Sequence, residues 1–178
     1  MFKQLRLGLF VVLAALMPTM VQSASNAEIN AKTTEALQAF YKHSSAGKRL
    51  LQQAKGALVF PEVYKAGFGI GGEYGEGKLI EKGKTTGYYS IAAASIGFQL
   101  GAQVKTEIIL FMTDSALRQF KNSDGWEAGV DGSVALVTIG AGGEIDTSTI
   151  KDPVIGFIFS NKGLMYNLSL EGSKISRK

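Results

Sequence analysis

The chain has no cysteine and a single histidine, His43, among its 178 residues. Without cysteine no disulfide stabilises the fold, so the hydrophobic core must be sufficient by itself. Zinc sites are built largely from cysteine and histidine, and a serine–histidine nucleophile would also have to use His43. That residue lies between Lys42 and Ser44, where we expect a surface position. The composition therefore favours a protein with no metal, no cofactor and no nucleophilic catalysis.

Net charge is also small. The first 25 residues contain Lys3 and Arg6 and no acidic residue, so the 19 basic and 15 acidic residues of the whole chain become 17 and 15 beyond that segment. A nucleic-acid-binding domain is expected to carry a strongly basic face, and this balance does not favour one. Any attraction to a membrane must come from local clustering of basic residues.

The N-terminus has the pattern of a signal peptide. The positive start is followed by a short apolar run, Leu7–Met17, by the helix-breaking Pro18, and by small residues at Ser23 and Ser25. The run is shorter than the roughly 20 residues that span a bilayer, and an uncleaved anchor is the alternative. We expect residues 1–25 to be a signal peptide, cut after Ser23 or Ser25.

The remaining residues, 26–178, predict a single domain that is periplasmic or secreted, and that lies peripherally on a membrane if it binds one. No cysteine follows the apolar run, so a lipid-modified N-terminus has no attachment point.

Residues 26–55 predict helix, because apolar residues recur at spacings of three and four. Ser44, Ser45 and Gly47 interrupt the pattern. Basic residues surround the break: Lys42, Lys48, Arg49 and Lys55. One interpretation is a solvated helix pair that lies on a sheet. The other is a membrane-surface helix whose lysines meet lipid headgroups.

After Pro61 the period changes to two, which is typical of strands. In several runs one face of the strand is glycine, so another backbone or a large side chain can approach closely. The alternating runs are 67–74, 96–101, 126–136 and 164–171, and the runs 108–112 and 154–159 are apolar throughout. Residues 113–120 predict a short helix capped by Thr113 or Asp114. We expect an α+β fold, with N-terminal helices packed on a curved, mostly antiparallel, partly barrel-like sheet of about six to eight strands.

Residues 67–72 satisfy the dinucleotide pattern G-x-G-x-x-G, but the glycines continue to Gly77 and do not open a helix. Glu73 and Glu76 also add negative charge where a phosphate would lie, so we do not expect nucleotide binding. Carboxylate pairs leave a hydrolase open, with Glu73 and Asp131 as its named candidates. The available pairs are Glu73 with Glu76, Asp124 with Asp131, and Glu144 with Asp146. The last pair could form a cation site together with Asp152.

Trp126 is the single tryptophan, and its neighbours on the same face are apolar. A core position is therefore expected, and an anchor at a lipid interface is the alternative.

Four blocks of sequence, taken together, resemble the SYLF domain family. They are Ala54–Pro61 (AKGALVFP), Lys65–Gly77 (KAGFGIGGEYGEG), Ile96–Gln103 leading into Ile108–Met112, and Gly163–Leu164 with Ser169–Ser173. The resemblance spans nearly all of residues 26–178. Two segments, Tyr88–Ala92 and Met165–Leu168, depart from the family pattern, and these departures bear on ligand contacts more than on the fold.

The resemblance implies a phospholipid-binding module with no known catalysis, in which an amphipathic N-terminal segment and basic residues take part. By position, the candidate lipid-binding residues are Lys42, Lys48, Arg49 and Lys55. Anionic phospholipids or a membrane surface are the expected partners. Actin binding belongs to eukaryotic relatives and is not expected here. The alternative function is a structural or protein-interaction domain of the cell envelope with no physiological lipid ligand.

Overall fold

The structure is a computed structural model, and it describes residues 23–137, 151–160, 163–164, 170 and 172–178. The elements, in chain order, are α1 (Asn26–His43), α2 (Ser45–Gln53), β1 (Gly56–Glu81), β2 (Lys84–Phe111), α3 (Asp114–Asn122), β3 (Trp126–Glu127), β4 (Ala135–Leu136), β5 (Val154–Ser160), β6 (Gly163–Leu164) and β7 (Lys174–Arg177).

Serine hydroxyls set the N-termini of the first two helices. The Ser25 hydroxyl accepts from the Glu28 amide at the start of α1, and the Ser44 hydroxyl accepts from the Gly47 amide at 2.8 Å. Such caps satisfy amide groups that have no partner within the helix. Ser44 also has an extended backbone, so it ends α1 and begins α2. The break predicted from the sequence is confirmed at this residue.

The long β1–β2 hairpin dominates the sheet. Its two-residue turn has positive φ at both positions, 50° at Lys82 and 76° at Gly83, as a type I′ turn requires. β2 pairs with β1 along nearly its whole length. On its other edge β2 pairs with β7 near its start and with β5 near its end.

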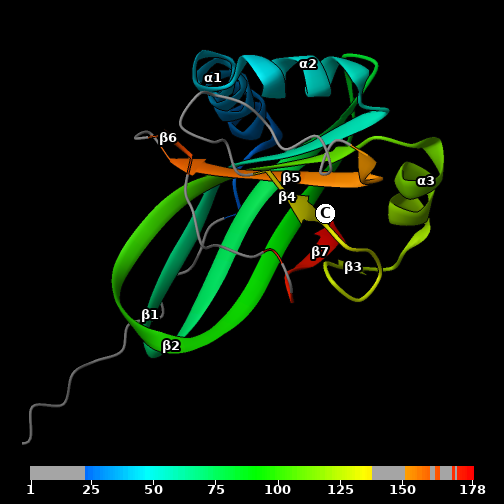
Figure 1. The fold of residues 1–178 in the computed structure, drawn as a ribbon. Helices are drawn as coiled ribbons and strands as arrows, with labels where there is room; N and C mark the ends of the chain where they lie inside the picture. The colour runs from blue at the N-terminus through cyan, green and yellow to red at the C-terminus, as the bar shows by residue number, and fades with distance from the viewer. Residues whose placement is uncertain (1–22, 138–150, 161–162, 165–169, 171) are drawn as a thin grey trace, which may run out of the picture.

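The described strands form one seven-stranded sheet. In it β3 pairs with β7, and both β4 and β6 pair with β5. Only the β4–β5 pairing is parallel among these strands. Figure 1 shows the hairpin curling strongly along its length, with α1 and α2 on one side of the sheet. The expected α+β fold with a curved, mostly antiparallel, partly barrel-like sheet is confirmed.

Glycines allow the hairpin to curl so far that β1 returns to its own first half. A Cβ atom at Gly77 would overlap the carbonyl oxygen of Val59, and one at Gly75 would lie 2.8 Å from the carbonyl oxygen of Glu62. Register shifts between Phe60 and Val63 and between Gly67 and Gly69 mark irregularities along the curve. Close approach of another backbone, predicted for the glycine face of residues 67–71, is observed further along the strand, at Gly75 and Gly77.

The hydrophobic core has two parts, one on each side of the sheet. The inner part contains Leu58, Phe60, Leu79, Ile109, Phe111, Leu117, Phe120 and Trp126 among others. The outer part, under the helices, contains Phe40, Leu50, Val59, Ile108, Ile155 and Phe157 among others. Phe40 of α1 meets Phe157 of β5 edge to face, with ring centroids 4.8 Å apart. Both faces of the central strands are therefore buried, as the apolar runs 108–112 and 154–159 predicted.

Trp126 is 2% exposed and packs edge to face against Phe111 and Phe120, so the core interpretation is confirmed and the interface anchor is wrong. The run 126–136, however, is not one strand. The backbone turns at Gly129 (φ 88°), and Val130 is 74% exposed, so the chain forms the short β3 and β4 instead. The short helix predicted at residues 113–120 is α3, and Thr113 caps it.

We predict that Gly77→Ala lowers the free energy of unfolding by about 3 kcal/mol, because the added methyl group forces apart two packed backbone segments. Gly72→Ala is the matched control in the same strand, since its Cβ would lie 3.7 Å from the nearest atom, the Ala93 oxygen. We expect that control to change stability by less than about 1 kcal/mol. Urea unfolding of both variants measures the difference. Equal effects would contradict the close approach.

Candidate functional site

The four predicted lipid-binding residues are all exposed. Lys42 lies in the last turn of α1, Lys48 and Arg49 lie in α2, and Lys55 lies between α2 and β1. The Lys48 ammonium group lies over the Tyr41 ring, 5.5 Å from its centroid, which ties the two helices together. The structure leaves their role in lipid binding a prediction.

The apolar stripe of these helices is largely used in the fold. Ile29, Ala36, Phe40 and Leu50 are buried against the sheet, as the solvated-pair interpretation expects. Leu37, Tyr41 and Leu51 are only partly buried, so part of the stripe still reaches the surface.

These partly buried residues line a cavity between the helices and the end of the hairpin, which we call the helix–hairpin cleft. Its volume is about 420 Å³, and its lining is Thr33, Thr34, Leu37, Tyr41, Leu51, Gln52, Ala54, Ala57, Lys78, Ile80, Lys82 and Gly83. Two lysines and no acidic side chain are in this lining. The cleft therefore combines an apolar wall with positive charge, which suits an amphipathic anion.

Two buried polar groups lie at the wall of this cleft. Thr33 is 1% exposed, and its hydroxyl has no hydrogen-bond partner among the described residues. The Lys78 ammonium group donates to the Asn30 side-chain oxygen at 2.8 Å, and burial lowers the pKa of Lys78. A buried hydroxyl without a partner costs folding free energy, so it is a natural place to seek a ligand contact.

The largest of the other described cavities has a different charge. Its volume is about 660 Å³, and it lies between α1 and strands β1, β2 and β5. Its ionisable lining residues are Lys32, Glu35, Glu62 and Lys105, which balance each other in formal charge. An anion is better matched by the helix–hairpin cleft.

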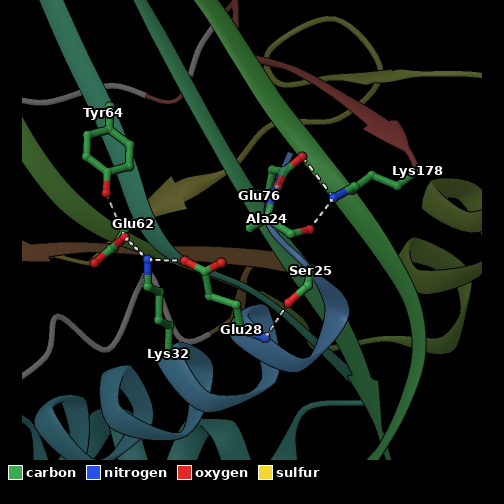
Figure 2. A network of polar contacts seen from close by, with 8 residues as sticks. All are labelled: Ala24, Ser25, Glu28, Lys32, Glu62, Tyr64, Glu76 and Lys178. Atoms are coloured by element: carbon green, nitrogen blue, oxygen red, sulfur yellow. Dashed lines mark hydrogen bonds and ion pairs between the residues drawn. The ribbon is translucent and has the colours of Figure 1, made fainter. Parts of the chain in front are cut away.

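A polar network joins the start of α1 to β1 and to the C-terminal residue (Figure 2). The Lys32 ammonium group lies 2.8 Å from carboxylate oxygens of both Glu28 and Glu62, and Glu62 also accepts from the Tyr64 hydroxyl. Burial disfavours the charged form of Glu62, but the bonds from Lys32 and Tyr64 outweigh it and lower its pKa. This network fixes α1 on β1.

An ionic cluster lies on the inner face of the curled hairpin, where β1 and β2 contribute alternate residues. The Lys105 ammonium group is 2.5 Å from Glu73 and 2.9 Å from Glu107, and Lys65 is 2.9 Å from Glu73. Lys105 and Glu107 have side chains that are 1% exposed. Burial raises the pKa of Glu107, and the second carboxylate oxygen of Glu107 has no hydrogen-bond partner among the described residues.

The carboxylates named for a hydrolase are not brought together as a pair. Glu73 binds the two lysines of the inner cluster, whereas Glu76 accepts from Ser23, Ala24 and Tyr74. Successive odd and even residues of a strand point to opposite faces, so Glu73 and Glu76 lie on different sides of β1. Asp131 accepts from the Glu127 amide at 2.7 Å in the loop after β3.

Within the described part of the chain, no three acidic or histidine side chains form a metal-binding group, and no helix is long and apolar enough to cross a membrane. Glu144 and Asp146, named as cation ligands, lie outside the described residues, as do residues 140–143 and 166–168. His43 is exposed, as expected.

Sequence reasoning missed Thr33, Lys78 and Lys82. Thr33 lies in an amphipathic helix, where a threonine carries no functional signal by itself. The signal that could have identified Lys78 is the two-residue period of the strand. Lys78 lies between Gly77 and Leu79 in sequence, and Leu79 belongs to the inner core, so the Lys78 side chain lies on the opposite face of the strand. Only the curl of the hairpin brings that face to α1.

The described residues form a small α+β domain with a cleft of mixed apolar and basic lining, and comparison with known proteins shows what it is similar to. Residues 92–178 match the family model Ysc84, described as "Las17-binding protein actin regulator". Over these residues, just under half of the chain, the sequence matches the Ysc84 (SYLF) family model, and the resemblance seen in the sequence is confirmed. Two of the four sequence blocks, residues 54–61 and 65–77, precede the matched region.

The chain is also similar to SH3 domain-containing YSC84-like protein 1 of Rattus norvegicus, and equally to that of Mus musculus and of Bos taurus. In each case 28% of 129 aligned residues are identical. The alignment covers 70% of this chain and 38% of the relative, so the chain spans well under half the length of these relatives.

We predict that acid destabilises the protein through Glu73, a carboxylate of the inner ionic cluster. Burial raises the pKa of Glu73, but its bonds to Lys105 and Lys65 outweigh burial and lower that pKa below the usual 4.5. When the pKa of a carboxyl group is lower in the folded state than in the unfolded state, its charged form stabilises the fold. This contribution is complete above the unfolded-state pKa and is lost as pH falls through the folded-state pKa. Glu107 has a raised pKa and acts in the opposite direction.

Glu73→Gln should therefore lower stability at neutral pH by about 3 kcal/mol, and should reduce the further loss below about pH 4.5. Glu35→Gln is the control, because Glu35 is exposed and has no ion pair among the described residues. Thermal unfolding followed by circular dichroism between acidic and neutral pH measures both. Parallel pH curves for wild type and Glu73→Gln would show that this carboxylate does not contribute.

Proposed function

We propose that this chain is an exported, non-catalytic module that binds anionic phospholipids, with the headgroup and upper acyl region received by the helix–hairpin cleft. The observation that carries the proposal is the lining of this cleft. It combines Lys78 and Lys82 with partly buried apolar side chains, it contains no acidic residue, and the buried Thr33 hydroxyl lies at its wall.

The exposed basic residues would act first, at long range. Each lysine or arginine near an anionic membrane surface contributes about 1 kcal/mol of attraction, which decays within a Debye length. Lys42, Lys48, Arg49 and Lys55 lie on the helices and the helix–strand junction that form one side of the cleft, and Lys82 lies on the turn at the other side. Their placement would orient the cleft toward the membrane.

Short-range contacts would then involve the cleft itself. Leu37, Tyr41 and Leu51 are partly buried, so a lipid that covers them removes apolar surface from water. A phosphate oxygen is an acceptor that suits both the Lys78 ammonium group and the Thr33 hydroxyl. The buried residues of α1 and α2 keep their place in the core, so binding on this scheme requires no helix to leave the sheet.

The family description names Las17 binding and actin regulation, and these are properties of the proteins it describes. We do not propose them for this chain, because the proposed signal peptide would place it outside the cytoplasm. The competing function is a protein-interaction domain of the cell envelope, and the lipid experiment below distinguishes the two.

We predict that the purified protein cosediments with anionic vesicles at low salt and is released at high salt, and that neutral vesicles do not retain it. The triple change Lys48→Glu, Arg49→Glu and Lys55→Glu should abolish the binding, because it replaces attraction with repulsion. Lys82→Glu alone should weaken it by about tenfold or more, since a charge reversal at one surface site changes the attraction by about 2 kcal/mol.

Arg118→Glu is the matched control, because Arg118 is an exposed basic residue of α3, away from the cleft. It should bind like the wild type. Equal loss in Arg118→Glu and Lys82→Glu would indicate an effect of net charge alone. Absence of binding to any vesicle would favour the envelope-protein alternative, with crosslinking in the intact envelope as the next measurement.

A further inference from the structure

Glu76 is the point where the two ends of the described chain meet. Its side chain is 7% exposed. It accepts from the Ser23 hydroxyl at 2.9 Å, from the Ala24 backbone nitrogen at 2.6 Å and from the Tyr74 hydroxyl at 2.9 Å, and the Lys178 ammonium group lies 2.9 Å away. The Ala24 contact is the shortest of the four. Figure 2 shows the Lys178 ammonium group joined by dashed lines to both Glu76 and Ala24.

The side chains of this network are short of one positive charge. In the part of the chain that the structure describes, the carboxylates of Glu28, Glu62 and Glu76 form ion pairs with two ammonium groups, those of Lys32 and Lys178. A third cation near Glu76 would balance them. The backbone nitrogen of Ala24 is already within hydrogen-bond distance of that carboxylate, and it would be a cation if it were the start of the chain.

We propose that the chain is cut between Ser23 and Ala24, and that the α-ammonium group released on Ala24 forms an ion pair with Glu76. The inference rests on the export included in the proposed function, and it does not depend on lipid binding. It selects the first of the two cleavage positions that the sequence allows, where Ser23 is the small residue before the cut.

The reaction is a peptide-bond hydrolysis by a peptidase that removes signal peptides. The bond between the Ser23 carbonyl carbon and the Ala24 nitrogen breaks. Water supplies the hydroxyl to Ser23, which leaves as a carboxylate, and a proton to the nitrogen. A second proton from solvent makes that nitrogen an ammonium group at neutral pH, since an unperturbed α-amino group has a pKa of about 7.7–8.0. The Ala24 nitrogen thereby gains two N–H donors, and the Ser23 hydroxyl is lost with the cleaved segment.

The second position, after Ser25, fits the folded structure less well. Ser25 caps α1 by accepting from the Glu28 amide, and its removal would leave that amide without a partner. The new ammonium group would then lie on Asn26, the first residue of α1, where the positive end of the helix dipole disfavours a cation. The bond from Lys178 to the Ala24 carbonyl oxygen, 3.2 Å, would also be lost.

Space for the ammonium group is available. A cavity of about 150 Å³ lies beside Ala24, and Glu28, Glu62, Tyr74 and Glu76 are among the residues that line it. A polar cavity of this size can hold water, which can accept the remaining N–H donor. The lining contains three carboxylates and one ammonium group, that of Lys32, so it favours a cation.

The first test is the intact mass and N-terminal sequence of the full-length chain after expression and export in a bacterial host. We expect a mature protein that begins at Ala24. A protein that begins at Met1 would overturn the proposal and the proposed export together. One that begins at Asn26 would overturn the cleavage position alone and leave the export intact.

The second test measures the ion pair on this exported protein. Amine-reactive labelling over a pH series, read by peptide mass spectrometry, reports the protonation of the Ala24 nitrogen. In the folded wild type we expect half-labelling at a pH at least about one unit above that of the urea-unfolded protein, which corresponds to about 1.4 kcal/mol. An amino group whose pKa is higher in the folded state stabilises the fold through its charged form. This contribution is complete below the unfolded-state pKa and is lost as pH rises through the folded-state pKa.

Glu76→Gln should return the labelling to the lower pH, and Glu62→Gln should change it much less. Both carboxylates line the cavity beside Ala24, but Glu62 binds Lys32 and Tyr64, whereas Glu76 binds the Ala24 nitrogen. If Glu76→Gln does not fold, the labelling curves of folded and urea-unfolded wild type still test whether the ion pair forms. Equal labelling curves for those two states would overturn the ion pair.

Discussion

The close approach of two backbone segments of β1 is the constraint on which the rest of this structure depends. Gly77 lies directly against the Val59 carbonyl group, and Gly75 lies against Glu62. A side chain at either position would force the segments apart. Because β2 pairs with β1 along its length, the whole hairpin follows this curl, and the sheet acquires an inner and an outer face.

The two faces of the returning half of β1 have different partners. Inward, Glu73 joins the buried ionic cluster and Leu79 joins the inner core. Outward, Glu76 meets the segment before α1, and Lys78 meets Asn30 of α1. The helix–hairpin cleft lies further along this outer face. The curl therefore supplies both the cleft proposed for lipid and the acceptor proposed for the mature N-terminus.

Local features of this fold could be predicted from the sequence, and long-range ones could not. The helix break at Ser44, the cap at Thr113 and the buried strands follow from patterns within a few residues. The strand predicted over residues 126–136 failed because Gly129 turns the chain, which the alternation of apolar residues does not reveal. Lys78 and Thr33 could not be paired in advance, since their proximity depends on the curl. The exposed basic residues were found from charge clustering, which needs no tertiary information.

The most direct test of the account is an amide NMR titration of the labelled protein with a short-chain anionic phospholipid, kept below its micelle-forming concentration. A neutral lipid with the same acyl chains is the comparison. We expect the largest shifts at Thr33, Leu37, Lys78 and Lys82, and much smaller shifts with the neutral lipid. Shifts centred on α3, or equal responses to the two lipids, would contradict the assignment of the cleft as an anionic-lipid site.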